Sequence, residues 1–127
     1  MYALLLVVLG GGMGAGLRHG VNLGAARWLG TEFPWGTLTV NVVGSFLIGL
    51  FAAWFAFRGD NYTTQSLRLF LTTGILGGFT TFSAFSLDFA LLFERGEATM
   101  AIVYVVSSVV LSLAAIFAGL WLVRSFA

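Results

Sequence analysis

Residues 35–57 read WGTLTVNVVGSFLIGLFAAWFAF, an uncharged and mostly apolar stretch that decides the fold class of the chain. A helix needs about 20 such residues to cross the hydrocarbon core of a bilayer. Similar runs predict further helices at about 2–28, 67–93 and 99–124. Across the chain 59% of residues are hydrophobic and 9% are charged, which is typical of a protein whose solvent is lipid.

These runs are too long and too uniformly apolar for membrane β-strands, which alternate inward and outward residues over about ten positions. The first run also differs from a secretory signal, because no positive charge precedes it and its apolar stretch is too long. We therefore expect an all-α membrane protein with four transmembrane helices. The connections are short, so residues 1–127 are expected to form a single domain. The chain has no cysteine, which excludes disulfides and thiolate metal sites.

The distribution of positive charge bears on the orientation of the chain in the membrane. There is no lysine, and four crossings place both termini on one side. The six arginines divide evenly, with Arg58, Arg68 and Arg124 on the side of the termini and Arg18, Arg27 and Arg95 on the other. Because the positive-inside bias fixes topology, a balanced chain has little reason to choose one orientation. Insertion in both orientations is expected, and with it an antiparallel, dual-topology homodimer.

Glycines recur at four-residue spacing, which permits close approach of helices. The pairs are Gly10 and Gly14, Gly12 and Gly16, Gly16 and Gly20, Gly20 and Gly24, and Gly74 and Gly78. Packing within one subunit explains any single pair at least as well as a contact between subunits. Together the pairs predict a compact bundle.

Polar groups inside apolar helices are costly and tend to mark pathways or partners. Thr37, Asn41 and Ser45 recur every four residues and so share one face of the second helix. An interhelical hydrogen bond of about 1 kcal/mol would account for Asn41 equally well.

The third helix contains residues 74–86, GILGGFTTFSAFS, where three glycines and several hydroxyls lie near mid-span. Helix propensity is low there, so we expect a break. A broken helix at membrane depth needs partners for its freed carbonyls, and a bound cation is one such partner. Phe82 and Phe85 lie on one side of the resumed helix and are candidates for lining a narrow path, although ordinary aromatic packing would also place them so.

Two segments, residues 36–46 (GTLTVNVVGSF) and 77–86 (GGFTTFSAFS), resemble the hallmark motifs of the Fluc (CrcB) fluoride channels. Residues 10–18 (GGGMGAGLR) are similar to a third segment of that family. The resemblance covers the whole chain in length, helix count and order. It implies an antiparallel homodimer in the prokaryotic plasma (inner) membrane, with two pores that export fluoride passively. Membrane lipid is the other expected partner, and no nucleic acid is expected.

Transferred residue by residue, the resemblance assigns the ring pair that faces fluoride to Phe82 and Phe85, and the amide that orients it to Asn41. Ring edges carry positive charge and suit an anion that has lost its water. The hydroxyls expected to form a donor track beside the rings are those of Ser83, Ser86, Ser108 and Ser112. Chloride is larger and should be hindered by a narrow bore.

The resemblance also implies a structural sodium ion at the dimer interface, held by the backbone carbonyls of Gly77 and Thr80. Tyr104 matches an aromatic position near the pore, although membership of an aromatic belt is possible for it. Arg18 matches a vestibular cation, and snorkelling to the interface explains it equally well. The family pattern often has a small hydroxyl residue where this chain has Ala84.

Functions of other classes fit the residues less well. A small multidrug exporter of similar size needs a buried carboxylate in its first helix, and residues 1–31 contain no Asp or Glu. A membrane enzyme needs a nucleophile and base or a metal cluster, and the chain has one His and no Cys. We therefore expect no enzymatic activity. A purely structural subunit is harder to exclude, but it leaves the polar strip beside the two phenylalanines unexplained.

Overall fold

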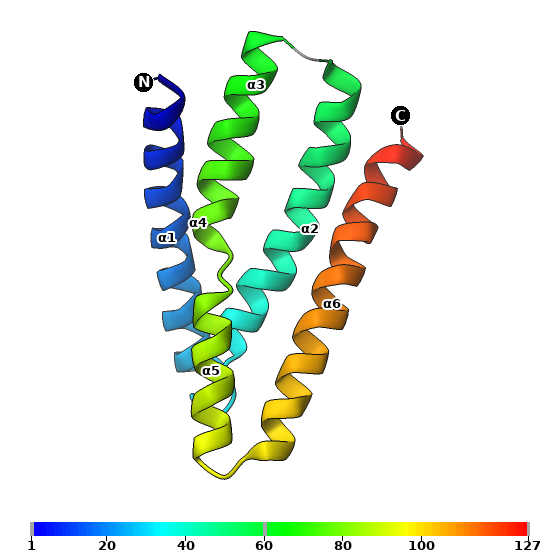
Figure 1. Ribbon diagram of the computed structural model, residues 1–127. Helices are drawn as coiled ribbons and strands as arrows, with labels where there is room; N and C mark the ends of the chain where they lie inside the picture. Colours follow the sequence, from blue (N-terminus) through cyan, green and yellow to red (C-terminus); the bar gives the residue numbers. More distant parts are fainter. Residues whose placement is uncertain (1, 60, 127) are drawn as a thin grey trace.

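The computed structural model describes residues 2–59 and 61–126, and all regular structure in these ranges is helical. The elements in chain order are α1 (Tyr2–Leu29), α2 (Trp35–Arg58), α3 (Tyr62–Arg68), the π-helical η1 (Leu69–Leu76), α4 (Gly77–Phe79), α5 (Ser83–Glu94) and α6 (Ala98–Ser125) (Figure 1). Elements α3 to α5 follow one another as a single crossing. The described chain therefore has four helical segments long and apolar enough to span a membrane, which confirms that expectation.

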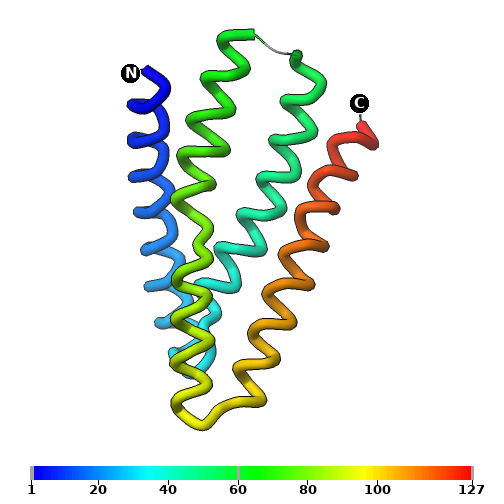
Figure 2. Tube along the Cα trace, in the orientation of Figure 1, coloured from blue at the N-terminus to red at the C-terminus, as the bar shows by residue number. Residues whose placement is uncertain are grey.

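The helices run up and down the bundle, and both termini lie at the same end (Figures 1 and 2). The closest neighbours are α2 with α6, and α1 with η1 and α4. The third crossing begins at Tyr62, earlier than the predicted residue 67. The reason is a local cap, because the Asn61 side-chain oxygen accepts a hydrogen bond from the Thr64 amide at 2.9 Å.

The interruption of the third crossing lies after the glycines. Gly74, Gly77 and Gly78 are all helical, and helical structure stops at 80–82 before it resumes at Ser83. Thr80 adopts an extended backbone with ψ of 157°. Figure 1 shows the two halves joined by a short irregular link, so the segment is a bent helix with one interruption.

Close backbone packing against α1 explains why the glycines remain helical. A Cβ atom added to Gly74 would lie 3.0 Å from the Gly10 Cα, and one added to Gly78 would collide with the Gly11 carbonyl. Gly14 lies in the same way against the Ile75 carbonyl. Glycine therefore provides the contact between the first and third crossings, and this packing outweighs its low helix propensity.

The remaining glycines of the α1 series point elsewhere. Cβ atoms added to Gly12, Gly16, Gly20 or Gly24 would meet no described atom within 4 Å. The four-residue spacing thus covers two faces of α1, one packed inside the subunit and one open.

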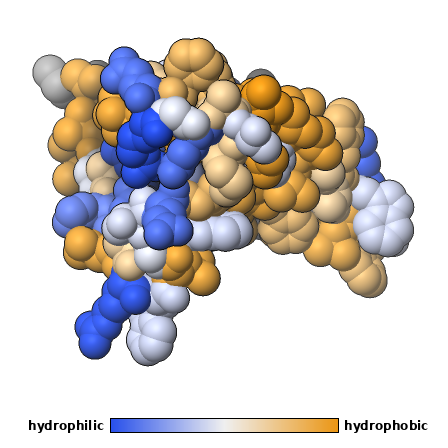
Figure 3. All heavy atoms as spheres, turned by 90° about the horizontal axis from the view of Figure 1, so that it is seen from below, coloured by the Kyte–Doolittle hydropathy of each residue, from blue (hydrophilic) through white to orange (hydrophobic). Residues whose placement is uncertain are grey.

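The sides of the bundle are apolar and exposed, as lipid or a partner subunit requires. Figure 3 views the end where α5 finishes and α6 begins, and polar atoms gather over part of this face while apolar atoms cover the rest. The buried core is small and divided. One cluster contains Phe33, Leu38, Leu92, Ala101 and Tyr104, and the other contains Val40, Leu76 and Phe79.

Candidate functional site

The interruption of the third crossing is held open by Asn41 of α2. Its Oδ1 accepts a hydrogen bond from the Thr81 backbone N–H at 2.8 Å, and its Nδ2 donates to the Thr81 carbonyl at 3.0 Å. The side-chain amide therefore supplies both partners that a continuous helix would have given to Thr81. Gly44, one turn further along α2, leaves the space in which the Thr80 methyl group packs.

This arrangement changes the surroundings of two backbone carbonyls. In an uninterrupted helix the Thr81 N–H would donate to the Gly77 carbonyl, and the Ala84 N–H would donate to the Thr80 carbonyl. Here the Thr81 N–H donates to Asn41, and the Ala84 N–H donates to the Thr81 hydroxyl at 3.1 Å. The helical donors of both carbonyls are thus engaged elsewhere, and the cation assigned to these oxygens stays a prediction.

Around the interruption, backbone carbonyls rather than ionisable side chains are the possible metal ligands. No cluster of three or more His, Cys, Asp or Glu side chains able to hold a metal occurs among the described residues. The neighbouring Thr80 hydroxyl donates to the Leu76 carbonyl at 3.0 Å, so its oxygen stays beside the interruption.

Phe82 and Phe85 stand side by side just after the interruption. Their ring centroids are 5.5 Å apart and their planes are inclined by 43°. Phe82 is 78% exposed although it lies at the middle of a membrane-crossing segment. Phe85 is half-buried, and its ring packs against that of Tyr104 at 5.1 Å. The two rings therefore form one wall with one free side.

A groove of about 380 Å³ opens along this wall, between α2, the interruption and α6. Its lining residues are Asn41, Ser45, Thr80, Thr81, Phe82, Phe85, Ser108, Val109, Ser112 and Leu113. The structure thus brings together five of the predicted pore residues from three separate stretches of sequence. The polar side chains among them carry amides or hydroxyls, and none of the lining residues is charged.

Ser108 is notable among them because its hydroxyl is buried and has no hydrogen-bond partner within the described part of the chain. The neighbouring Ser107 hydroxyl, in contrast, donates to the Val103 carbonyl at 2.7 Å. Buried polar groups are nearly always paired, so the Ser108 hydroxyl is a candidate donor to a group outside the described chain.

Other predicted site residues lie outside the groove. The Ser83 hydroxyl is 3.4 Å from that of Thr81, and the Ser86 hydroxyl donates to the Phe82 carbonyl at 3.1 Å, both in exposed positions. Arg18 is half-buried on α1 and lines neither this groove nor the hollow described next. The pore and vestibule roles given to these three residues stay predictions.

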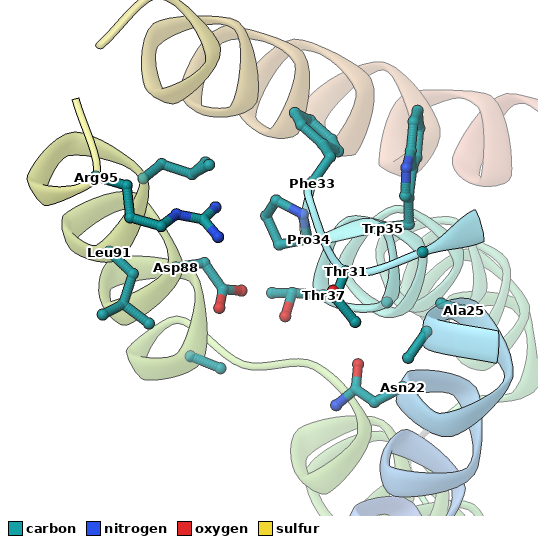
Figure 4. A pocket seen from close by; sticks show the side chains of 15 residues that line it. Asn22, Ala25, Thr31, Phe33, Pro34, Trp35, Thr37, Asp88, Leu91 and Arg95 are labelled. Atoms are coloured by element: carbon teal, nitrogen blue, oxygen red, sulfur yellow. The ribbon is translucent and has the colours of Figure 1, made fainter. Parts of the chain in front are cut away.

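Tyr104 is fully buried in α6 and donates a hydrogen bond from its hydroxyl to the Asp88 carboxylate at 3.1 Å. Asp88 lines a second hollow of about 320 Å³ near the end of the bundle (Figure 4). Asn22, Thr37 and Arg95 also contribute to its lining. Phe85, Tyr104 and Asp88 therefore form a contiguous chain of contacts between the groove and this hollow.

The lining residues that were not predicted as site residues include Ser45, Thr81 and Asp88. Ser45 was signalled by its spacing from Asn41 along one helix face. Thr81 gave no signal of its own, because its part is played by the backbone. The pairing of Asp88 with Tyr104 joins two helices and has no signature in local spacing.

Comparison with known proteins finds a family match and relatives that cover almost the whole chain. Residues 5–120 match the protein family described as CrcB-like protein, Camphor Resistance (CrcB). A relative from Mesorhizobium japonicum, named fluoride-specific ion channel FluC, is 57% identical over 125 residues, 98% of either chain. The protein named FluC 2 from Nitrobacter hamburgensis is 58% identical over 94% of this chain and 95% of its own. A FluC relative from Rhizobium johnstonii is 54% identical over the full length of both chains.

Proposed function

Because the chain belongs to the CrcB family, we propose that it is a fluoride-selective ion channel that lets fluoride leave the cell passively. Its four apolar segments and its channel relatives make it an integral membrane protein and an ion channel rather than an enzyme. The proposal is carried by one structural observation. The groove is lined by two phenylalanine rings, an amide and a hydroxyl without a partner among the described residues, and by no charged side chain.

Each part of the groove suits a small dehydrated anion. Fluoride holds its water strongly, so a pore must offer many donors in exchange. The edges of Phe82 and Phe85 carry partial positive charge, and the hydroxyls of Ser108 and Ser112 follow them along α6. Asn41 uses one Nδ2 hydrogen to hold Thr81, and an amide carries a second that is suited to an ion. Size and donor number would then discriminate against chloride.

The groove of one subunit is open on one side, which favours a homodimer. Phe82 is 78% exposed, and the adjacent backbone is irregular at a depth where lipid offers no hydrogen bonds. Irregular backbone is tolerated in a bilayer only where protein or water covers it. A second copy would close the groove, and the evenly divided arginines favour opposite orientation of the two copies. An antiparallel dimer of this kind would contain two pores.

A sodium ion at the dimer interface fits the same region. The carbonyls of Gly77 and Thr80 would hold it, because their helical donors are engaged elsewhere. Two such carbonyls from each subunit give an oxygen set of the type that hard cations prefer. The ion would supply charge to the interrupted backbone and so stabilise the pairing of subunits.

The channel would reside in the inner membrane of a prokaryotic cell, in contact with membrane lipid. Fluoride enters acid-exposed cells as its neutral acid and dissociates in the more alkaline interior. The anion would then leave through the pore down its own gradient, without ATP.

The proposal is tested by fluoride efflux from liposomes that contain the purified protein. Phe82→Ile removes a ring edge from the groove and should slow fluoride efflux by at least tenfold, since about 1.4 kcal/mol of lost ion stabilisation has that effect. Phe117→Ile is the matched control, because Phe117 is 66% exposed on α6 and lies outside the groove. If both variants slowed efflux equally, or if neither slowed it, the ring pair would not line the fluoride pathway.

A further inference from the structure

The hollow at the end of the bundle contains a charged group that the groove lacks. Arg95 projects into it from the end of α5, and the Asp88 side chain projects from the same side (Figure 4). Asn22 of α1 and Thr37 of α2 approach from the opposite side. Of the described residues that line this hollow, Arg95 is the one cation.

Several carboxylates surround the hollow, so the charge of Arg95 affects how an anion approaches it. Glu32, Glu94 and Glu97 are exposed in or next to the two connections that meet here. An approaching anion therefore meets three exposed carboxylates at this end, against the exposed guanidinium groups of Arg27 and Arg95. The carboxylate of Asp88 adds a further negative charge inside the hollow, where it accepts the Tyr104 hydroxyl at 3.1 Å.

Hydrogen bonds hold the Arg95 guanidinium at the mouth of the hollow. Nη2 donates to the Glu32 carbonyl at 3.2 Å and lies 3.4 Å from the Glu97 carboxylate. The ion pair leaves the Arg95 side chain 50% exposed, so water screens the pair and the guanidinium remains accessible to solutes. The bond to the Glu32 carbonyl ties the α5–α6 connection to the α1–α2 connection.

The hollow also lies next to the groove. Ala84 and Asp88 line the hollow, while Phe85 of the same helix lines the groove. Tyr104 connects the two, because it contacts Asp88 of the hollow and Phe85 of the groove.

We infer that Arg95 is the cation that draws fluoride into the pathway at this end of the bundle. The inference rests on the proposed channel function and assigns the entrance to this hollow. The hollow contains one positive and one negative side chain, so loss of the Arg95 charge would leave Asp88 alone to repel an anion, and this repulsion would decline as salt screens it.

The test is the initial rate of fluoride efflux from liposomes at low fluoride concentration and constant sodium. Potassium isethionate sets the ionic strength, because the Debye length falls from about 30 Å at 0.01 M to about 3 Å at 1 M. Arg95→Gln should slow efflux about threefold to tenfold at low salt and restore nearly the wild-type rate at 1 M. Arg95→Lys keeps the charge but not the planar fork, and should conduct like the wild type.

Arg27→Gln is the matched control. It removes the same charge from the same end, but the Arg27 guanidinium lies over the Trp28 ring at 5.8 Å and does not line the hollow. Its efflux rate should equal that of the wild type in all salts. A wild-type rate for Arg95→Gln at low salt, a loss that persists at 1 M, or an equal loss in Arg27→Gln would overturn the inference. A wild-type protein that releases no fluoride in any salt would instead contradict the channel function itself.

Discussion

The hydroxyls of Ser108 and Ser107 are neighbours in sequence with opposite surroundings. The first is buried, unpaired among the described residues and part of the groove lining, while the second is bonded to backbone carbonyls. Ser108→Ala should slow fluoride efflux about tenfold, because a hydrogen bond to an ion contributes roughly 1.5–3 kcal/mol. The thermal unfolding temperature should not fall, since no internal hydrogen bond is lost. Ser107→Ala should conduct normally, and a Ser108→Ala variant that conducts equally well would exclude this hydroxyl from the path.

Asn41 and Asn61 allow the same chemical change in two contexts. Asn41→Asp replaces the Nδ2 donor to the Thr81 carbonyl with a second acceptor, and adds negative charge beside the groove. Fluoride efflux should fall by at least 100-fold, because charge repulsion and the loss of the interrupted backbone geometry act together. Asn61 contributes its side-chain oxygen as a cap for the Thr64 amide, which a carboxylate can replace, so Asn61→Asp should keep both stability and efflux. Similar efflux in both variants would contradict the part assigned to Asn41.

Residue spacing predicted some of these contacts and not others. Asn41 and Ser45 are four residues apart on one helix, and both line the groove as a shared face requires. Thr37 belongs to the same stripe but lines the other hollow, because the stripe is longer than the groove. The Tyr104 to Asp88 hydrogen bond joins residues on different helices, and only tertiary structure could reveal it.

Among the elements, α1 and the third crossing can pack closely because glycines, which have no side chain, lie at their contact. Gly14→Ala would force a methyl group against the Ile75 carbonyl, and overpacking of this kind costs about 1–3 kcal/mol. The unfolding temperature of the purified protein should therefore fall. Gly16→Ala is the control within the same helix, because its added Cβ meets no described atom within 4 Å. If Gly14→Ala were as stable as Gly16→Ala, the close approach of the two helices would be wrong.

The position of the interruption shows where local propensity fails. Low helix propensity over residues 74–86 predicted a break in this crossing, and within that stretch Gly74 and Gly78 remain helical because α1 packs directly on them. The chain leaves the helix at Thr80 instead, and Asn41 from another helix binds the released Thr81 backbone. Composition could predict that the crossing is interrupted, whereas the residue at which it happens depends on partners distant in sequence.

For the whole molecule, opposite orientation of two copies is open to a labelling test. The chain contains no native cysteine, so single cysteines report cleanly. Ser125→Cys places a thiol at the end that carries the termini, and Glu97→Cys places one at the other end. A membrane-impermeant maleimide added outside intact cells should label about half of the molecules of either variant. Full labelling of one variant and none of the other would establish a single orientation.

Sodium dependence is a second property of the assembly. Removal of sodium by prolonged exchange for N-methyl-D-glucamine should lower fluoride efflux by more than half, because the Gly77 and Thr80 carbonyls would lose their cation. Returning sodium should restore the rate, whereas potassium should restore less. Full efflux after exhaustive exchange, verified by atomic emission, would argue against a bound ion.

The most direct test of the account compares fluoride and chloride in the same liposomes with the wild-type protein. Ion-selective electrodes would follow both anions after a potassium ionophore is added to balance charge. The groove of ring edges, amide and hydroxyls predicts rapid release of fluoride while chloride is retained. Release of both anions at similar rates, or of neither, would contradict it.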